Sequence, residues 1–447
     1  MNASIGGSER SQEAGATQRQ LDAARDVVAR LARRLDLDLS VRLWDGSRHA
    51  LGSAVTSPLE IRISDPGVIA SLLRRPSLET LIRHYIGKRI DITGGTLFDF
   101  GRALQRRGGR ARLRTGEMLG MAARLSPFLF APGRRPADHE TFQGDYVGHH
   151  RRSADNKDYI RFHYDLSNDF YALFLDPEMV YSCAYYTDWS NDLATAQRDK
   201  LEMICRKLRL KAGERLLDVG SGWGGLVCHA ALHHGVEAHG ITLSEQQLDY
   251  AREKVRRLGL DGRVTFELAD YTEVRGRYDK IASVGMCEHI GLANIPLYMT
   301  KIRGLLADDG LFLNHAISGR AEKPRLLPKR MRPERKAIAR YIFPGGELDD
   351  IGHSVAAMEI AGFEVHDVEG WRMHYARTCR LWCERLTAQR DIAISHVGEE
   401  KYRIWVAYLA GVGLAFERGT LRLFQTLASK SARRPPPLPP TRADLYR

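Results

Sequence analysis

One segment of this 447-residue chain constrains the fold more than any other: an apolar run that leads directly into a glycine-rich turn. Leu216 to Val219 is typical of a buried strand, and Gly220 to Gly225 follows it as Gly-Ser-Gly-Trp-Gly-Gly. Glycines at the start of a helix let a ligand approach the backbone and meet the unpaired N–H groups of the first turn. The segment therefore predicts a strand, a tight turn and a helix that together bind a nucleotide-type ligand.

The residues after the turn separate two cofactor classes. The glycine spacing fits both the dinucleotide pattern GxGxxG and the methyltransferase pattern GxGxG. A dinucleotide site also needs an acidic residue about 20 residues further on, to bind a ribose hydroxyl. Here the next predicted strand ends at Thr242 and is followed by Leu243 and Ser244, so no acidic residue is present at its end. Asp218 before the turn and Asp270-Tyr271 after the third strand occupy positions where methyltransferases meet their cofactor. These residues favour a methyltransferase, with a dehydrogenase as the alternative.

Residues 146–430 alternate predicted strands and helices at the spacing of an α/β fold. A helical pattern covers Glu245 to Leu258, and two further helices, Arg372 to Arg390 and Glu399 to Ala428, close the domain. The predicted strands are Arg215 to Val219, Glu237 to Thr242, Val264 to Leu268, Tyr278 to Val284, Gly310 to Ala316 and Phe363 to Val368. We expect an α/β fold, a Rossmann-like class I methyltransferase domain.

Residues 21–130 predict a smaller N-terminal accessory domain of α+β or helical type. An amphipathic helix begins at Leu21, short strands cover Val41 to Trp44 and Leu59 to Ile63, and a helical pattern runs from Val68 to Tyr85. We expect this domain to be the part of the protein that docks on a lipid or membrane surface.

Three segments lie outside the two predicted domains. Residues 1–20 have few large apolar side chains, so we expect a disordered N-terminus. Residues 131–145 include a Gly, Pro and Arg-rich stretch and are predicted to form a linker. Residues 431–447 contain a polyproline-like run and are predicted to be a disordered tail.

The charge of the chain suggests a polyanionic partner. Lys and Arg number 67 against 55 Asp and Glu, which gives a net charge of +12. Basic residues concentrate between Arg102 and Arg114, interleaved with apolar ones, and again between Lys329 and Arg340. This pattern suits an anionic membrane surface, whereas a nucleic-acid partner is not expected because no matching motif is present.

Three further features predict a cytoplasmic location. The longest apolar stretch, Ile404 to Phe416, is shorter than the roughly 20 residues of a membrane span, and the N-terminus lacks the apolar core of a signal peptide. The six cysteines show no CxxC pair and no zinc spacing, so we expect reduced thiols and no metal site.

Seven segments, in order along the chain, resemble the cyclopropane-fatty-acyl-phospholipid synthase family, which includes the mycolic acid cyclopropane synthases. They are His163 to Tyr171 (HYDLSNDFY), Tyr181 to Tyr185 (YSCAY), Leu217 to Gly224 (LDVGSGWG), Thr242 to Ser244 with Gln247, Gly285 to Gly291 (GMCEHIG), Tyr341 to Gly346 (YIFPGG) and His374 to Thr378 (HYART). Residues 1–145 resemble the family's accessory domain more loosely. One departure is Ser221, where the family turn commonly has Cys.

The resemblance implies transfer of a methyl group from S-adenosylmethionine to a cis double bond of a phospholipid acyl chain, closing a cyclopropane ring. It places the cofactor on Tyr181, Ser182, Asp218, Gly220, Ser221, Gly222, Trp223, Gly224, Thr242, Gln247, Asp270 and Tyr271. It places a bicarbonate ion, the base that removes a proton, on Cys183, Glu288, His315, Ile317 and Tyr375. Tyr164 and Tyr185, with Phe170 and Tyr375, are candidates to stabilise the developing cation.

Several alternatives stay open at the level of sequence. The same methyl transfer can end in a methylene- or methyl-branched fatty acid, because only the proton that is lost differs. A non-catalytic basic protein that binds lipid or RNA is a further alternative. By resemblance we also expect a peripheral position on the inner face of the cell membrane, and a homodimer.

Overall fold

The computed structural model describes residues 5–108, 123–129, 166–321, 331–431 and 438–446, with residues 116, 120, 141, 142, 145, 146 and 159. Side chains are described from residue 18 onward, except those of residues 106–108. The chain divides into two compact units. Unit 1 comprises Met1–Thr141, Met331–Ala337 and Gly398–Gly411, and unit 2 comprises Phe142–Arg330, Ile338–Val397 and Val412–Arg447. Unit 1 thus includes residues 398–411, which the sequence assigned to the catalytic domain.

Unit 1 is built on a four-stranded sheet in the order β2-β1-β3-β4. Strands β1 and β3 are parallel and the other two pairs are antiparallel. More than half of its buried core residues are leucines from α1 and from positions that flank the strands, including Leu21, Leu39 and Leu59. The elements are α1 (Ile5–Leu35), β1 (Ser40–Arg42), β2 (Arg48–Ala50), β3 (Glu60–Ile63), α2 (Gly67–Arg74), α3 (Leu78–Ile86), β4 (Ile90–Thr93), α4 (Leu97–Gly108) and η1 (Ser126–Phe128).

Two predictions for unit 1 were wrong. Helix α1 begins at Ile5, although residues 1–20 were predicted to be disordered. Its first turn is Ile-Gly-Gly-Ser, but the residues from Glu9 to Gln20 include no proline and several Glu, Gln, Ala and Arg residues, which favour a helix. The helix predicted from Val68 to Tyr85 is two helices, because Pro76 interrupts the pattern and Ser77 caps α3 by accepting a hydrogen bond from the N–H of Thr80.

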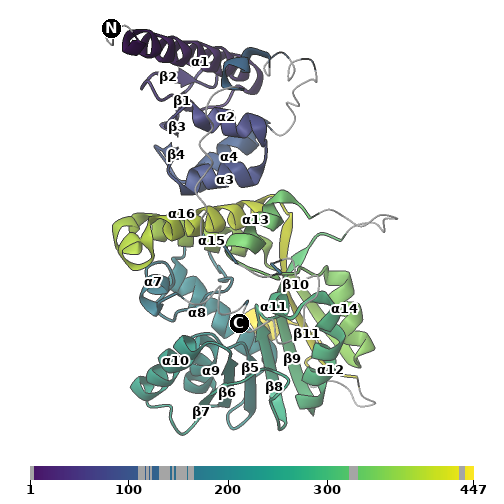
Figure 1. Ribbon diagram of the computed structural model, residues 1–447. Helices are drawn as coiled ribbons and strands as arrows, with labels where there is room; N and C mark the ends of the chain where they lie inside the picture. Colours follow the sequence, from purple (N-terminus) through teal and green to yellow (C-terminus); the bar gives the residue numbers. More distant parts are fainter. Residues whose placement is uncertain are drawn as a thin grey trace. The chain divides into compact units, whose positions relative to one another are not determined.

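Unit 2 contains a seven-stranded sheet in the order β10-β11-β9-β8-β5-β6-β7 (Figure 1). The pairs among β5 to β9 are parallel, whereas β11 is antiparallel to both β9 and β10. The strands are β5 (Arg215–Val219), β6 (Glu237–Thr242), β7 (Val264–Leu268), β8 (Tyr278–Val284), β9 (Leu306–Gly319), β10 (Phe363–Gly370) and β11 (Leu421–Lys430). This parallel-dominated sheet confirms the predicted α/β, class I methyltransferase fold.

Helices cover both faces of this sheet. One core cluster joins the strands to α8, α9 and α10, and a second joins them to α12 and α14 (Figure 1). The helices are α7 (Asn168–Ala172), α8 (Leu193–Leu208), α9 (Gly225–His234), α10 (Glu245–Leu258), α11 (Cys287–Ile290), η2 (Leu292–Asn294), α12 (Ile295–Leu305), α13 (Pro333–Tyr341), α14 (Ile351–Ile360), α15 (Arg372–Ala388), α16 (Arg390–Glu417) and η3 (Ala443–Tyr446). α13 and α16 each include residues of unit 1, and α16 is broken at Gly398.

The C-terminal part of unit 2 corrects two predictions. A single helix was predicted from Glu399 to Ala428, but α16 ends at Glu417 and β11 begins at Leu421. Gly419, with a φ of 70°, turns the chain between them in a conformation that suits glycine. The tail predicted to be disordered includes an ordered part: Leu445 is buried, and Asp444 forms an ion pair with Arg209 at 3.2 Å.

Among the described residues, no helix is long and apolar enough to cross a membrane. Arg110, Arg112 and Arg114 of the first basic cluster, and Lys329 and Arg330 of the second run, lie outside the described residues. The predicted linker at 131–145 lies almost entirely outside them as well.

Candidate active site

The predicted glycine turn lies between β5 and α9, with three left-handed glycines. The φ angles are 81° at Gly220, 54° at Gly222 and 81° at Gly224. The N–H groups of Gly220 and Ser221 both donate to the carbonyl of Ile241, at 3.1 and 2.9 Å. A Cβ at Gly224 would lie 2.7 Å from the ring of Phe266. Glycine is therefore required here for the backbone conformation and for the packing of the turn against β7.

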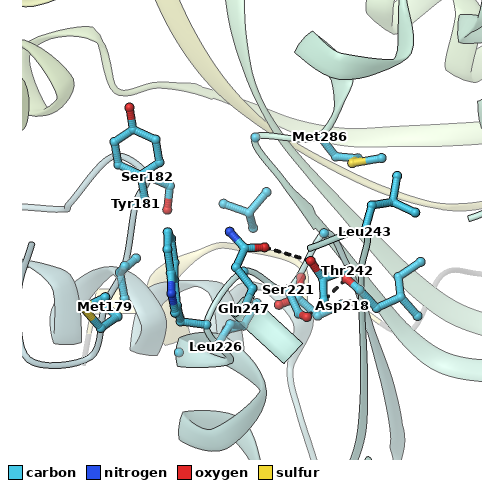
Figure 2. Close-up of a pocket in the computed structure, with 18 of the residues that line it drawn as sticks. Met179, Tyr181, Ser182, Asp218, Ser221, Leu226, Thr242, Leu243, Gln247 and Met286 are labelled. Atoms are coloured by element: carbon cyan, nitrogen blue, oxygen red, sulfur yellow. Dashed lines mark hydrogen bonds between the residues drawn. The ribbon is translucent and has the colours of Figure 1, made fainter. Parts of the chain in front are cut away.

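A pocket opens above this turn at the carboxyl ends of β5, β6 and β8, and Figure 2 shows the side chains around it. Gly224 alone among the predicted cofactor residues is absent from the pocket lining; it is the N-cap residue of α9 and packs against Phe266 and Ala251. The other eleven line the pocket: Tyr181, Ser182, Asp218, Gly220, Ser221, Gly222, Trp223, Thr242, Gln247, Asp270 and Tyr271. Sequence segments that are far apart thus converge on one site.

Thr242 and Gln247 form a hydrogen-bonded pair in the wall of the pocket (Figure 2). The hydroxyl of Thr242 donates to Oε1 of Gln247 at 2.7 Å. Because the Gln247 carbonyl is engaged, its NH₂ group is the end that can donate to a ligand. This pair occupies the strand end where a dinucleotide-binding protein would carry an acid.

Two buried ionisable side chains, Asp218 and Lys200, line the same pocket. Asp218 is buried, and its Oδ1 has no hydrogen-bond partner among the described residues. Burial raises the pKa of Asp218 to about 7, and the nearby Lys200 ammonium opposes this shift. Lys200, also buried, donates to Oγ of Ser182 at 3.0 Å. An orphaned carboxyl in a glycine-lined pocket fits a cofactor that carries positive charge, as S-adenosylmethionine does.

Lys200 was not predicted from the sequence. It lies on α8 between Ala196 and Ile204, both buried, at the helical spacing of four residues. A lysine on the apolar face of an amphipathic helix was the available signal, because such a group is seldom buried without a partner.

A second set of polar residues adjoins the pocket along the chain. Glu288 directly precedes His289 of the pocket wall, and Cys183 directly follows Ser182. Oε1 of Glu288 accepts a hydrogen bond from the backbone N–H of Ile317 at 2.5 Å. Burial raises the pKa of Glu288 to about 7. Oε2 of Glu288 and Nε2 of His315 are buried and have no hydrogen-bond partner among the described residues.

Trp371 connects the remaining candidates. The thiol of Cys183 lies 3.9 Å from the carbonyl of Trp371, and the ring of His315 meets the indole edge-on, with the ring centres 5.7 Å apart. Tyr185 packs against the indole, with centres 4.7 Å apart. The N–H of Tyr375 donates to the same Trp371 carbonyl at 3.2 Å. Trp371 itself was not among the predicted site residues.

The other aromatic candidates have different surroundings. The ring of Tyr375 stacks on Phe416, with centres 4.6 Å apart. Phe170 is fully buried and packs edge-on against Tyr171 and Phe174, as a core residue does. Tyr164 lies outside the described residues.

One group of potential metal ligands lies away from this pocket. A ligand atom of each of Cys205, His229 and His234 lies within 4.8 Å of the others, a proximity that the sequence spacing did not indicate. Oε2 of Glu202 lies 3.3 Å from Nε2 of His229 and 3.0 Å from Nε2 of His234. Hydrogen bonds to this carboxylate account for both imidazoles without a metal ion.

Comparison with known proteins identifies the family. The sequence model of the mycolic acid cyclopropane synthetase family matches residues 150–426. The chain belongs to this family. A relative described as a probable fatty acid methyltransferase from Pseudomonas putida is 39% identical over 416 residues, covering 92% of this chain and 97% of the relative. Cyclopropane-fatty-acyl-phospholipid synthase of Escherichia coli strain K12 is 37% identical over 268 residues, covering 60% of this chain and 66% of that protein.

Solved structures of family members agree with this assignment. Mycolic acid cyclopropane synthase CmaA1 complexed with SAH and CTAB is 34% identical, with a TM-score of 0.58 over 61% of this chain and 98% of that chain. Cyclopropane synthase MmaA2 from Mycobacterium tuberculosis is 32% identical, with a TM-score of 0.59 over 61% of this chain and 98% of that chain. The protein is an S-adenosylmethionine-dependent methyltransferase of the cyclopropane synthase family, which confirms the resemblance read from its motifs.

Proposed function

We propose that this enzyme transfers a methyl group from S-adenosylmethionine to the cis double bond of an unsaturated phospholipid acyl chain and closes a cyclopropane ring. The observation that carries the proposal is that Oε2 of Glu288 and Nε2 of His315 are both buried without a hydrogen-bond partner among the described residues. Both residues adjoin the cofactor pocket through the fold, because Glu288 precedes His289 of the pocket wall and His315 pairs with Val284 of the wall across β9 and β8. After methyl transfer to an alkene a proton must leave a carbon atom, so the site has to hold a base next to the cation. The relative from Escherichia coli carries the name of this reaction.

The reaction makes three demands on the protein. S-adenosylmethionine supplies an electrophilic methyl group when bound. The π electrons of the alkene form the new C–C bond, the C–S bond breaks, and positive charge is left on the second alkene carbon. The methyl carbon then loses a proton to a base, and the C–H electron pair closes the ring. The site must therefore align a neutral nucleophile, stabilise a cation and hold a base.

Aromatic faces meet the second demand. Tyr185, Trp371 and His374 pack together, with ring centres 4.7 to 5.9 Å apart. Each aromatic face near a cation contributes about 0.5–2 kcal/mol of attraction. Burial lowers the pKa of His374 and so favours its neutral form, which does not repel a carbocation.

The third demand is met in this proposal by a bicarbonate ion held between Glu288 and His315. Nε2–H of a neutral His315 would donate to one oxygen of the ion, and Oε2 of Glu288 would accept from its hydroxyl group. Cys183, Ile317 and Tyr375 complete the site by resemblance. In the structure the N–H of Ile317 is already engaged by Glu288, so the ion would share that donor or displace the carboxylate from it.

The substrate chain lies in a membrane, so the enzyme has to dock there. The net charge of +12 supplies an attraction of about 1 kcal/mol for each Lys or Arg near an anionic surface. Arg332, Arg335 and Lys336 of the second basic run are exposed. We expect flotation with anionic vesicles that weakens as salt is added. Equal binding to zwitterionic vesicles would contradict this mode of docking.

A second product is favoured by one specific comparison. The relative that spans 97% of its own length in the match is described as a probable fatty acid methyltransferase rather than a cyclopropane synthase. Loss of a proton from a chain carbon next to the cation, rather than from the added methyl carbon, would leave a methyl-branched alkene. Loss of a proton from the methyl-bearing carbon would also leave a methyl-branched alkene. Both of these routes share with ring closure every step that precedes the loss of the proton.

Expression in a bacterium that lacks its own synthase tests the proposal. Membrane fatty acids would be analysed by gas chromatography–mass spectrometry and by proton NMR. A product one CH₂ unit heavier than its monounsaturated parent, with upfield ring protons, supports the cyclopropane reading. The same mass with vinylic protons supports the branched product. No new fatty acid from a folded protein that binds S-adenosylmethionine would contradict both.

A further inference from the structure

A chain of hydrogen bonds runs from Glu369 through Lys207 and Gln425 to His315. Lys207 pairs with Glu369, and its ammonium also donates to Oε1 of Gln425 at 2.8 Å. Nε2 of Gln425 then lies 3.0 Å from Nδ1 of His315. Lys207, Gln425 and His315 are each 1% exposed, so water does not compete for these contacts.

The direction of each bond follows from the chemistry of the ammonium. An ammonium group can only donate, so the atom of Gln425 that faces Lys207 must be the carbonyl oxygen. The amide nitrogen of Gln425 therefore faces His315 and donates to Nδ1. Burial and the nearby charges of Lys200 and Lys207 lower the pKa of His315 well below its ordinary value, so the ring is neutral. A neutral imidazole that accepts at Nδ1 carries its proton on Nε2.

The surrounding elements hold this chain in one arrangement. Gln425 and His315 are directly paired across the antiparallel strands β11 and β9, which places their side chains on the same face of the sheet. Lys207 is on the last turn of α8, and its ammonium lies 5.2 Å from the centre of the Trp371 ring. Glu369 is on β10. Three strands and one helix therefore fix the donor and acceptor roles before any ligand binds.

We propose that Lys207 and Gln425 are positioning residues that fix the tautomer of His315, so that its Nε2–H is presented to the site as a hydrogen-bond donor. The value of that donor for binding the base rests on the proposed function. The tautomer itself does not, and it can be measured in the protein without substrate.

The direct test is NMR of the full chain labelled with ¹⁵N and ¹³C in histidine, at about pH 8, where neutral rings dominate. The His315→Gln variant identifies the signals of His315 by their loss. Two-bond and three-bond nitrogen–proton couplings then show which nitrogen carries the proton. We expect Nε2–H in the wild type. We expect Nδ1–H in Gln425→Glu, because a carboxylate can only accept, and a mixture of both tautomers in Lys207→Met, because the Gln425 amide is then free to turn.

Matched variants separate this role from a loss of stability. Lys207→Arg keeps a cationic donor and should retain the wild-type tautomer. Lys254→Met removes another buried lysine that pairs with a glutamate, Glu178, but has no bond to Gln425 or His315. It should leave the tautomer unchanged. A wild-type ring protonated at Nδ1, or a Gln425→Glu variant with the wild-type pattern, would overturn the proposal.

Activity gives a second readout, which depends on the proposed function. In Gln425→Glu and Lys207→Met we expect kcat for alkene methylation to fall about 10- to 100-fold, as when the support of a catalytic group is removed. The affinity for S-adenosylmethionine should stay within about twofold. An unchanged kcat in a variant whose tautomer has changed would show that the donor has no part in the reaction. If the wild type methylates no alkene, the proposed function fails and the tautomer measurement still stands.

Discussion

The carboxylate of Glu288 and the backbone N–H of Ile317 are joined by a hydrogen bond of 2.5 Å. This bond connects α11 to β9. The segment before α11 lines the cofactor pocket, and β9 contains His315. It leaves the other carboxylate oxygen of Glu288 buried and without a hydrogen-bond partner among the described residues. A buried acceptor of this kind is costly unless a ligand completes it, so Glu288 is the residue through which the proposed base is best tested.

Glu288→Gln should lower the rate of alkene methylation by about 10²–10³-fold while the affinity for S-adenosylmethionine is unchanged. The amide offers one carbonyl oxygen and one NH₂ group in place of two acceptor oxygens. It therefore cannot both accept the hydrogen bond from the N–H of Ile317 and accept a hydrogen bond from the base. Turnover and calorimetric binding measure the two quantities. Glu364→Gln, an exposed change on β10, is the control. A rate within threefold of wild type, at roughly equal folded content, would remove Glu288 from the mechanism.

Depletion of bicarbonate should reduce turnover reversibly. Protein exchanged into buffer free of carbon dioxide should lose most of its activity, and added bicarbonate should restore it. The ion would restore little in His315→Gln, because that variant lacks the imidazole donor. Full activity after depletion, verified by measuring residual carbonate, would show that a side chain is the base.

Asp218→Asn should flatten the dependence of stability on pH. Asp218 and Glu288 both have pKa values raised to about 7 in the fold, above their ordinary values of 3.8 and 4.5. Between these limits folding takes up protons, so the stability of the ligand-free protein falls as pH rises from about 4 to about 7. Thermal unfolding at about pH 5 and about pH 8 measures the effect.

We expect the decrease to be smaller in Asp218→Asn and smaller again when Glu288→Gln is added. The single variant should also bind S-adenosylmethionine more weakly at every pH, because the carboxyl that faces the pocket is lost. A wild-type protein that gains stability from these two groups as pH rises would contradict the assigned shifts.

Gly224→Ala should destabilise unit 2 more than Gly259→Ala does. Both glycines have positive φ, 81° and 66°, so alanine at either costs about 1–2 kcal/mol in backbone strain. A Cβ at Gly224 also meets the Phe266 ring at 2.7 Å, whereas at Gly259 nothing lies within 4 Å. Overpacking adds about 1–3 kcal/mol. Chemical denaturation would compare the two, and equal losses would show that the turn tolerates a side chain.

The sequence predicted the strands around the cofactor pocket best. The bounds of β5, β6, β7 and β8 agree with the predicted ranges, and so do those of α10. These strands are short and end at glycine or at polar turns, and β5, β6 and β8 are each followed by a helix, with a recognisable start in the case of Ser244 before α10. In a parallel sheet such local signals coincide with the tertiary structure.

The sequence predicted β11 wrongly for a physical reason. Leu421 to Lys430 lies between two strands and is buried on both faces, so no period of two is visible along it. Its Leu, Gln and Ala residues are also good helix formers. The hydrogen bonds that select the strand come from β9 and β10, which lie more than 100 and about 60 residues away in the chain. No local pattern carries that information, and the roles of Lys207 and Gln425 were missed with it.

The position of β11 also determines when the enzyme can become complete during synthesis. Among the described strands, β10 pairs only with β11, and β11 is the last strand to be translated. The nascent chain can form the glycine turn and the parallel strands β5 to β9 early, while β10 waits for a neighbour. His315 can pair with Gln425 only after β11 has been added to the sheet. A ribosome-bound chain that stops before residue 421 would therefore have the cofactor pocket but would lack the hydrogen bond from Gln425 to His315. Such a chain is expected to bind the cofactor before it can catalyse the reaction.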